Sequence, residues 1–74
     1  MTRPFDELTK ALGQQVLVRL KGDRIIRGTL ASFDVHLNII LENAEELLNN
    51  EEQSVKEKHS KIMVRGDNII FIAL

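Results

Sequence analysis

The chain has 74 residues, no cysteine and a formal net charge of −1 at pH 7, and 43% of its residues are hydrophobic. This length predicts a single domain over residues 1–74, and the lack of cysteine excludes a disulfide framework and a thiolate zinc site. No apolar run is long enough for a membrane span and no signal-peptide pattern opens the chain, so a cytoplasmic protein is expected.

Charge is unevenly distributed along the chain. Six of the eleven acidic residues lie within residues 42–57, where Lys56 is the only basic residue. The rest of the chain carries nine of the ten Lys and Arg residues against five acids. A net charge near zero would argue against a nucleic-acid ligand, but the mildly basic remainder removes that objection.

Residues 3–12 (RPFDELTKAL) predict a short helix that covers one end of a sheet. Pro4 suits its first turn, and Gly13 is a plausible stop. The apolar side chains recur at spacings of three and four, which places them on one helical face. These side chains are Phe5, Leu8 and Leu12.

From there the apolar period changes to two, which is the period of β-strands. The predicted strands are 16–20, 24–33, 36–44, 58–64 and 69–74. In the first strand Val16, Val18 and Leu20 share a face, and in the third Leu37, Ile39 and Leu41 are expected to point inward. Gly28 interrupts the second strand, which indicates a bend, a bulge or a close backbone approach. Residues 46–57 are polar and weakly patterned, so they are expected to form a loop or an extended hairpin tip.

One helix followed by five antiparallel strands predicts a mainly β fold. With one strand bent, the helix would cap a strongly bent, partly open five-stranded barrel. The last strand, IIFIAL, is apolar at every position. Left at an edge, such a strand invites pairing with another chain, and a head-to-tail contact of this kind can close into a ring.

Two polar turns lie between strands, DVHLN (34–38) and RGDN (65–68). In an extended backbone alternate residues share a side, so Asp34, His36 and Asn38 are expected to lie together. In a barrel with this strand order the two turns can lie at the same end.

Side chains of the two turns suit a single-stranded RNA ligand. His36 and Arg65 are flat and can stack on a nucleobase, while Asn38 has a donor and an acceptor that match the edge of uracil. Asp34 and Asp67 can accept hydrogen bonds that hold Asn38 and Arg65 in place. Each stack contributes about 1–3 kcal/mol, so a ring of identical sites would bind much more strongly than one.

The chain resembles the Sm and Sm-like (Lsm) proteins, most closely the archaeal ones. Residues 13–43 are similar to the first family motif and residues 61–74 to the second, with 44–60 as an acidic variable segment. The matching positions in the first motif are Gly13, Val16, the LKGDR turn, Gly28, Leu30, Asp34, Asn38 and Leu41. The match in the second is IMVRGDNIIFI.

The resemblance implies the Sm fold and a ring, usually of seven subunits in this branch, formed by pairing the fourth strand with the fifth of the next subunit. It also implies binding of U-rich single-stranded RNA near the pore and a role in RNA processing or ribonucleoprotein assembly. His36 and Arg65 would sandwich the base, and Asn38 would read its edge.

Four further residues have roles implied by the resemblance or by their position. Asp67 would support recognition, Asp34 would order the first turn, and Gly66 would let the backbone come close to the nucleotide. Arg3, on the helix-bearing face, is a candidate for a second RNA contact, although an exposed Arg is usually only solvated.

The alternatives to a base-reading site are a capped turn and a metal site. Asp34 and Asn38 both favour local turn hydrogen bonds. A metal site would need Asp34, His36, His59 and Asp67 together, and no HxH or HxxxH pair supports it. We therefore expect no metal and no cofactor.

Enzymatic activity has no support, because the chain shows neither a nucleophile–base arrangement nor a phosphate-cradling glycine loop. The competing function is a protein-interaction ring with incidental RNA contacts, in which the acidic segment 42–57 is the recognition element. Such a scaffold would respond to charge reversal at four acids, namely Glu45, Glu46, Glu51 and Glu52.

Overall fold

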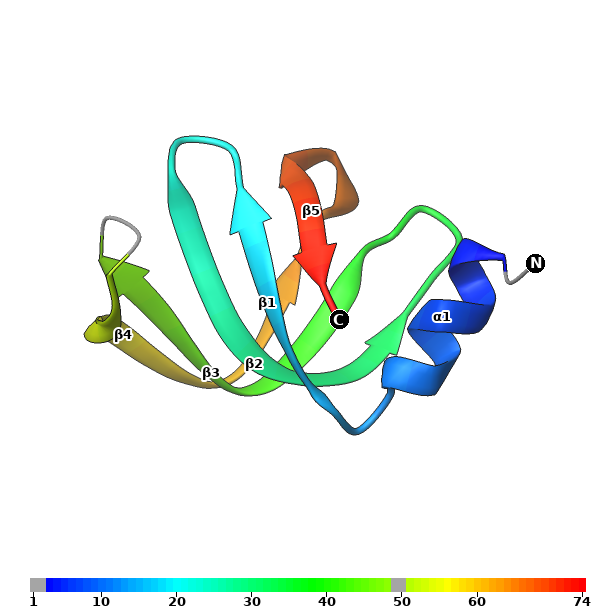
Figure 1. Ribbon diagram of the computed structural model, residues 1–74, viewed down its shortest axis with the longest axis horizontal. Helices are drawn as coiled ribbons and strands as arrows, with labels where there is room; N and C mark the ends of the chain where they lie inside the picture. Colours follow the sequence, from blue (N-terminus) through cyan, green and yellow to red (C-terminus); the bar gives the residue numbers. More distant parts are fainter. Residues whose placement is uncertain (1–2, 49–50) are drawn as a thin grey trace.

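The computed structural model describes residues 3–48 and 51–74, with side chains at 3–47 and 55–74. Over these residues one helix is followed by five strands, and a short 3-10 helix precedes the last strand (Figure 1). The elements are α1 (Pro4–Ala11), β1 (Gln15–Leu20), β2 (Arg24–Phe33), β3 (Ile39–Leu48), β4 (Glu51–Val64), η1 (Gly66–Asn68) and β5 (Ile69–Ala73). The strands form one antiparallel sheet in the order β4-β3-β2-β1-β5, which confirms the predicted class.

Helix α1 has the ends that its sequence predicts. Pro4 is at its first position, and the backbone N–H of Arg3 donates to the Asp6 carboxylate at 3.3 Å. Its buried side chains are Leu8 and Ala11, while Phe5 is half-exposed and stacks on Phe33 of β2 with ring centroids 5.6 Å apart. The helix therefore covers one end of the sheet, as Figure 1 shows.

The core consists of buried apolar side chains from the helix and the strands. Val16, Val18 and Leu20 are all buried, as the period of two in β1 predicts. They pack with apolar side chains from β2, β3 and β4, and these are Ile26, Leu30, Ile39, Leu41, Ala44 and Val64.

Gly28 marks the bend of β2. A Cβ at this position would lie 3.1 Å from both Cα and Cβ of Ala44 in β3, which is tighter than ordinary contact. The β2–β3 register also shifts between Arg27 and Thr29. Of the three possibilities expected at Gly28, which were a bend, a bulge or a close backbone approach, the register shift shows a bulge and the Ala44 contact a close approach. Strand β2 curves as drawn in Figure 1.

The start of the third strand was predicted wrongly. Strand β3 begins at Ile39, and residues 34–38 form a turn instead of extended backbone. Leu37 has φ 61° and is 39% exposed, so it does not point inward. The reason is local, because Asp34 accepts hydrogen bonds from the backbone of this segment and closes it into a turn.

The loop expected at 46–57 is also wrong, whereas the alternative of an extended hairpin is confirmed. Strands β3 and β4 stay paired as far as Leu48 and Glu51, and β4 is 14 residues long. Ion pairs follow the hairpin from strand to strand, at 3.8 Å between Lys61 and Glu42 and at 2.8 Å between Arg27 and Glu45. Within the segment expected to be a loop, Glu46 likewise pairs across strands, with Arg24 of β2 at 3.0 Å and with Lys56 of β4 at 3.9 Å.

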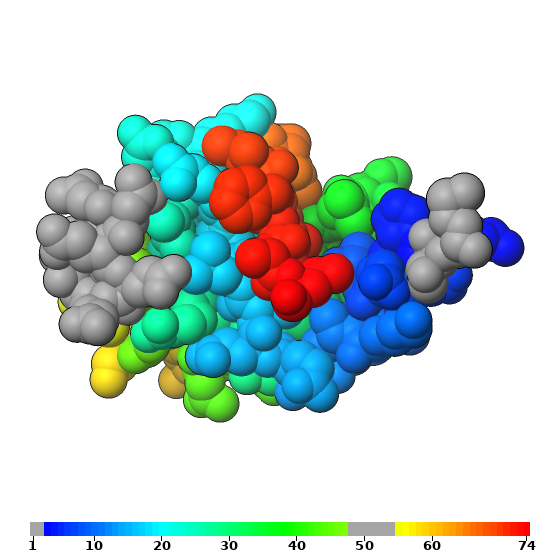
Figure 2. All heavy atoms as spheres, viewed as in Figure 1, coloured from blue at the N-terminus to red at the C-terminus, as the bar shows by residue number. Residues whose placement is uncertain are grey.

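Strands β4 and β5 are the two edges of the sheet. Strand β5, red in Figure 2, forms part of the surface beside β1 and α1. Exposed apolar side chains occur along both edge strands, and they include Met63 in β4 and Ile70 and Phe71 in β5. Among the described helices, none has the length and apolar character needed to cross a membrane.

Candidate nucleic-acid interface

The two polar turns meet at one end of the fold, as predicted. The backbone N–H of Gly66 in the second turn (65–68) donates to Oδ1 of Asn38 in the first turn (34–38) at 2.9 Å. The second turn is itself fixed to the β1–β2 connection, because the N–H of Lys21 donates to the Asn68 carbonyl oxygen at 2.9 Å. Residues 28 positions apart in the chain therefore share one site.

Asp34 organises the first turn through its carboxylate. Oδ1 accepts from the backbone N–H groups of His36 and Asn38 at 2.9 and 3.0 Å, and Oδ2 accepts from the side-chain Nδ2 of Asn38 at 3.0 Å. These hydrogen bonds, the one from the Asn38 side chain most of all, hold the pKa of Asp34 below its ordinary value of 3.8. Asp34 is therefore an ionised, acceptor-only group at neutral pH.

Asn38 is held from two sides. Its oxygen accepts from Gly66, and its nitrogen donates to Asp34. An amide oxygen has two lone pairs and an amide nitrogen has two hydrogens. One lone pair and one N–H therefore remain on a half-buried side chain whose orientation is set by the hydrogen-bond network.

Gly66 has a role that differs from the expected one. A Cβ at this position would overlap the carbonyl oxygen of His36 and lie 2.9 Å from the carbonyl carbon of Leu37. The missing side chain is thus required for the second turn to pack on the first. The approach to a nucleotide, which the sequence resemblance implies, stays a prediction.

Arg65 and Asp67 form the predicted pair. Nη2 of Arg65 lies 3.2 Å from Oδ2 of Asp67, with side chains 71% and 62% exposed, so the guanidinium is oriented but open to a ligand. The side chain of His36 is exposed and makes no hydrogen bond or ion pair with any described residue. Both flat groups predicted to stack therefore have surfaces free for a ligand.

Arg3 lies outside the two turns, at the start of α1, and is exposed. Its neighbour Pro4 lines a hollow of about 270 Å³ together with Leu37 of the first turn and Gly66 of the second. Arg3 therefore stands next to a surface that adjoins the site.

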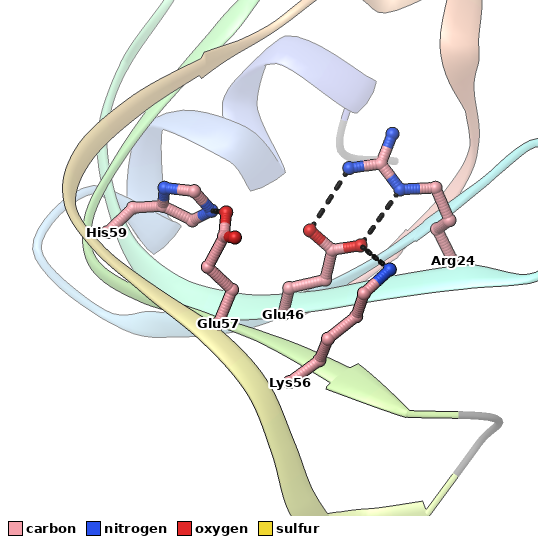
Figure 3. Close-up of polar contacts among 5 residues, drawn as sticks. All are labelled: Arg24, Glu46, Lys56, Glu57 and His59. Atoms are coloured by element: carbon pink, nitrogen blue, oxygen red, sulfur yellow. Dashed lines mark hydrogen bonds and ion pairs between the residues drawn. The ribbon is translucent and has the colours of Figure 1, made fainter.

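A cluster of five charged or titratable residues ties β2, β3 and β4 together (Figure 3). Both carboxylate oxygens of the buried Glu46 accept from Arg24, at 3.0 and 3.1 Å, and Lys56 lies 3.9 Å away. The hydrogen bond from Arg24 is the main cause that lowers the pKa of Glu46. His59 Nε2 is buried 3.1 Å from the Glu57 carboxylate and makes no hydrogen bond with the described residues.

Metal-ligating atoms of Glu46, Glu57 and His59 lie within 4.8 Å of one another. Glu46 is already neutralised by two cations that would repel a metal ion, so the cluster acts as a structural ion-pair network. The four residues first considered for a metal site are not gathered. His59 faces Glu57 on β4, whereas Asp67 faces Arg65 in the second turn.

Two of the four acids named for the competing scaffold hypothesis are occupied within the fold. Glu45 and Glu46 are held by Arg27 and Arg24. The side chains of Glu51 and Glu52 lie outside the described residues. The contacts that the sequence did not reveal are the long-range ones, Gly66 to Asn38 and Arg24 to Glu46, for which local spacing carries no signal.

Comparisons with known proteins agree with this architecture. The family model described as the LSM domain matches residues 6–74. An snRNP Sm-like protein of Methanosarcina acetivorans is 46% identical over 71 residues, which are 96% of this chain and 94% of that protein. The structure of the Pyrococcus abyssii Sm protein in complex with a uridine heptamer gives a TM-score of 0.88 at 38% identity, covering 97% of each chain. The SmAP1 heptamer of Pyrobaculum aerophilum gives a TM-score of 0.87 at 40% identity, covering 99% of this chain and 93% of that one.

Proposed function

Because this chain belongs to the LSM domain family, we propose that it forms a ring of identical subunits that binds uridine-rich single-stranded RNA at the two joined turns. The observation that carries the proposal is the amide of Asn38, which Asp34 and Gly66 hold with one N–H and one lone pair unused. The Pyrococcus abyssii relative in complex with a uridine heptamer supports the same ligand.

Uracil presents a carbonyl acceptor, O4, next to a donor, N3–H. The free N–H of Asn38 donates to O4, and the free lone pair accepts from N3–H. Adenine presents a donor at N6 beside an acceptor at N1, which is the reverse order. For a base that the stacking groups hold in one orientation, this order selects uridine, and the bonds form at an edge that an unstacked base exposes.

Stacking supplies affinity that does not depend on the base. His36 and Arg65 offer flat faces, and the ion pair with Asp67 orients Arg65 at 3.2 Å. Each stack on such a plane contributes about 1–3 kcal/mol. Arg3, beside the hollow that adjoins both turns, contributes a weaker second contact to the RNA backbone.

Assembly follows from the two edge strands. Strands β4 and β5 lie at opposite edges of the sheet, so pairing β4 of one subunit with β5 of the next is heterologous and closes into a ring. The similar P. aerophilum protein is a heptamer, and we adopt seven subunits. One ring then places seven uridine sites side by side, and their affinities reinforce one another through effective concentration.

We assign no catalytic role to the ring. Its side chains hold and read RNA, which suits a function in RNA processing or ribonucleoprotein assembly in the cytoplasm. In the sequence, each of the segments 13–43 and 61–74 contributes one of the two turns, and the hairpin between them separates the turns along the chain.

The direct test compares oligouridine with oligoadenosine by fluorescence anisotropy at fixed salt, using the wild type and Asn38→Ala. The mass of each assembly is measured on the same samples. We expect tighter binding of oligouridine by the wild type and loss of that preference in an intact mutant ring. A preference that survives Asn38→Ala would show that the first turn is only structural.

A further inference from the structure

Strand β4 is much longer than the strand that pairs with it in the proposed ring. It has 14 residues, Glu51–Val64, whereas β5 has five, Ile69–Ala73. Both are edge strands, and among the described strands β4 pairs only with β3. Pairing along the whole of β5 therefore leaves the larger part of β4 without a neighbour on its outer edge.

The distribution of apolar and charged residues along β4 indicates which part is left. The last three residues, 62–64, are apolar, as is β5 (Ile69–Ala73), whereas residues 55–59 read VKEKH. Lysines placed against an apolar strand would lose water without a partner, so the apolar end of β4 takes the contact between subunits. Residues 55–59, called the free edge from here on, then keep outward backbone N–H and C=O groups with no strand beside them.

The free edge is already extended and held in place. Residues 57–59 of β4 pair with residues 44–46 of β3 in an unbroken register. The buried Glu46 accepts two hydrogen bonds from Arg24 of β2, which ties this part of β3 to the rest of the sheet (Figure 3). A strand that is ordered in advance loses little conformational entropy when another strand adds to it.

The lysines of the free edge are surplus cations. The carboxylates of Glu45 and Glu46 already accept short hydrogen bonds from arginines of β2. The side chain of Lys56 lies 3.9 Å from Oε2 of Glu46 and is 59% exposed. That of Lys58 lies 3.9 Å from Oε2 of Glu45 and is 76% exposed. Both ammonium groups are beyond hydrogen-bond distance from these oxygens and keep donors for a carboxylate from outside the subunit.

We propose that the free edge binds an extended acidic segment of a partner protein by strand addition. Backbone hydrogen bonds supply the affinity, and Lys56 and Lys58 select aspartate or glutamate side chains. Glu57, the one acid of the free edge, lies 3.1 Å from His59. Lysines on an edge strand also oppose pairing with apolar strands. The proposal goes beyond RNA binding and takes from the proposed function only the ring, which decides how much of β4 stays free.

The probe is a short capped peptide in which pairs of glutamates alternate with single valines, labelled with fluorescein. Its binding to the wild-type assembly is measured by anisotropy at fixed salt, beside a peptide with lysine in place of every glutamate. We expect only the acidic peptide to bind. Lys58→Glu should weaken its binding by about fivefold or more at unchanged assembly mass. The matched control is Lys10→Glu, at a 70% exposed lysine of α1, which should keep the wild-type affinity.

Two further measurements separate strand addition from a simple attraction between charges. N-methyl groups on alternate residues of the peptide remove every second N–H donor. Methylation of the set that faces β4 should abolish binding, whereas methylation of the other set should leave it intact, because those N–H groups point away from the free edge. Amide hydrogen exchange at residues 55–59 should slow when the unmethylated peptide is bound.

Equal effects of the two methylated peptides, or unchanged exchange at residues 55–59, would overturn the proposal. Displacement of the peptide by oligouridine would overturn it too, since the lysines would then serve the RNA. Rings that associate in pairs and bind no peptide would place a second copy on the free edge instead of an acidic partner. None of these results changes the uridine preference measured without peptide, so the proposed function stands or falls separately.

Discussion

Gly66 lies against the carbonyl oxygen of His36, where any side chain would overlap the first turn. We predict that Gly66→Ala pushes the turns apart and breaks the hydrogen bond to Asn38. Overpacking of this kind costs about 1–3 kcal/mol, and the affinity for oligouridine should fall by about tenfold or more as the reading edge loses its anchor. Anisotropy and a urea unfolding curve, both at fixed subunit concentration, measure the two effects.

Gly13→Ala is a useful control for that experiment. Gly13, between α1 and β1, has φ +82° and open space around its missing Cβ, so alanine there is strained without touching either polar turn. It should lower the unfolding free energy by about 1–2 kcal/mol and leave the RNA affinity unchanged. Equal loss of affinity in the two variants would mean that Gly66 acts through general stability.

Asp34 allows a prediction about pH. Its pKa is lowered in the folded chain, mainly by the side chain of Asn38, so its hydrogen bonds stabilise the turn at all pH values above the unfolded pKa near 3.8. That contribution is lost only as the pH falls through the lowered folded pKa. NMR titration of the Asp34 carboxyl carbon should give a midpoint below 3.8 in the wild type and a higher midpoint in Asn38→Ala. Identical midpoints would show that Asn38 does not hold the carboxylate.

At the scale of elements, the β3–β4 hairpin depends on the buried Glu46. We predict that Arg24→Ala lowers the unfolding free energy by about 1–3 kcal/mol, because it removes both hydrogen bonds to a buried carboxylate. Lys61→Ala breaks a pair with Glu42 whose side chains are 67% and 46% exposed, and should cost about 1 kcal/mol or less. Urea unfolding of the two variants at equal subunit concentration measures both losses of unfolding free energy. Equal losses would contradict a special role for Glu46.

The same hairpin shows what local sequence can and cannot reveal. Helix α1 and strands β1 and β2 were predicted almost to the residue. Apolar periodicity, Pro4 and Gly28 each determine the backbone conformation of residues only a few positions away in the chain. The segment 46–57 was read partly as a loop, because the partner of Glu46 is Arg24 on β2, 22 residues earlier in the chain. Cross-strand partners are known only once the sheet exists.

The sequence predicted which residues form the site better than it predicted how they are arranged. Asp34, Asn38, Arg65 and Asp67 were chosen for their chemistry, and the pairs Asp34–Asn38 and Arg65–Asp67 are present. The extended backbone assumed at 34–38 was wrong, because the two hydrogen bonds that backbone N–H groups donate to the Asp34 carboxylate outweigh an apolar alternation of only two residues. Their roles toward RNA stay predictions.

For the whole molecule, the edge strands set the expected assembly. Ile70 in β5 is 57% exposed, so a lysine there disturbs the isolated subunit little. We predict that Ile70→Lys converts rings to smaller species by placing a charge in an apolar seam between subunits, and native mass spectrometry or sedimentation measures this. Leu12→Lys, at an exposed position beyond α1, is the control and should leave the mass unchanged. If both variants keep the mass of the wild-type assembly, the interface between subunits does not include Ile70.

The strand order β4-β3-β2-β1-β5 leaves every subunit with two different edges, and the proposed ring pairs one with the other. A growing row of subunits therefore always ends in one free β4 and one free β5, and only closure removes both. A subunit with one damaged edge still pairs with a row of subunits through its intact edge. The row then cannot add another subunit at that end and cannot close. A small fraction of such subunits should therefore block a larger fraction of rings, so damage to one edge is dominant. A subunit with both edges damaged pairs with no other subunit and leaves the intact ones unaffected.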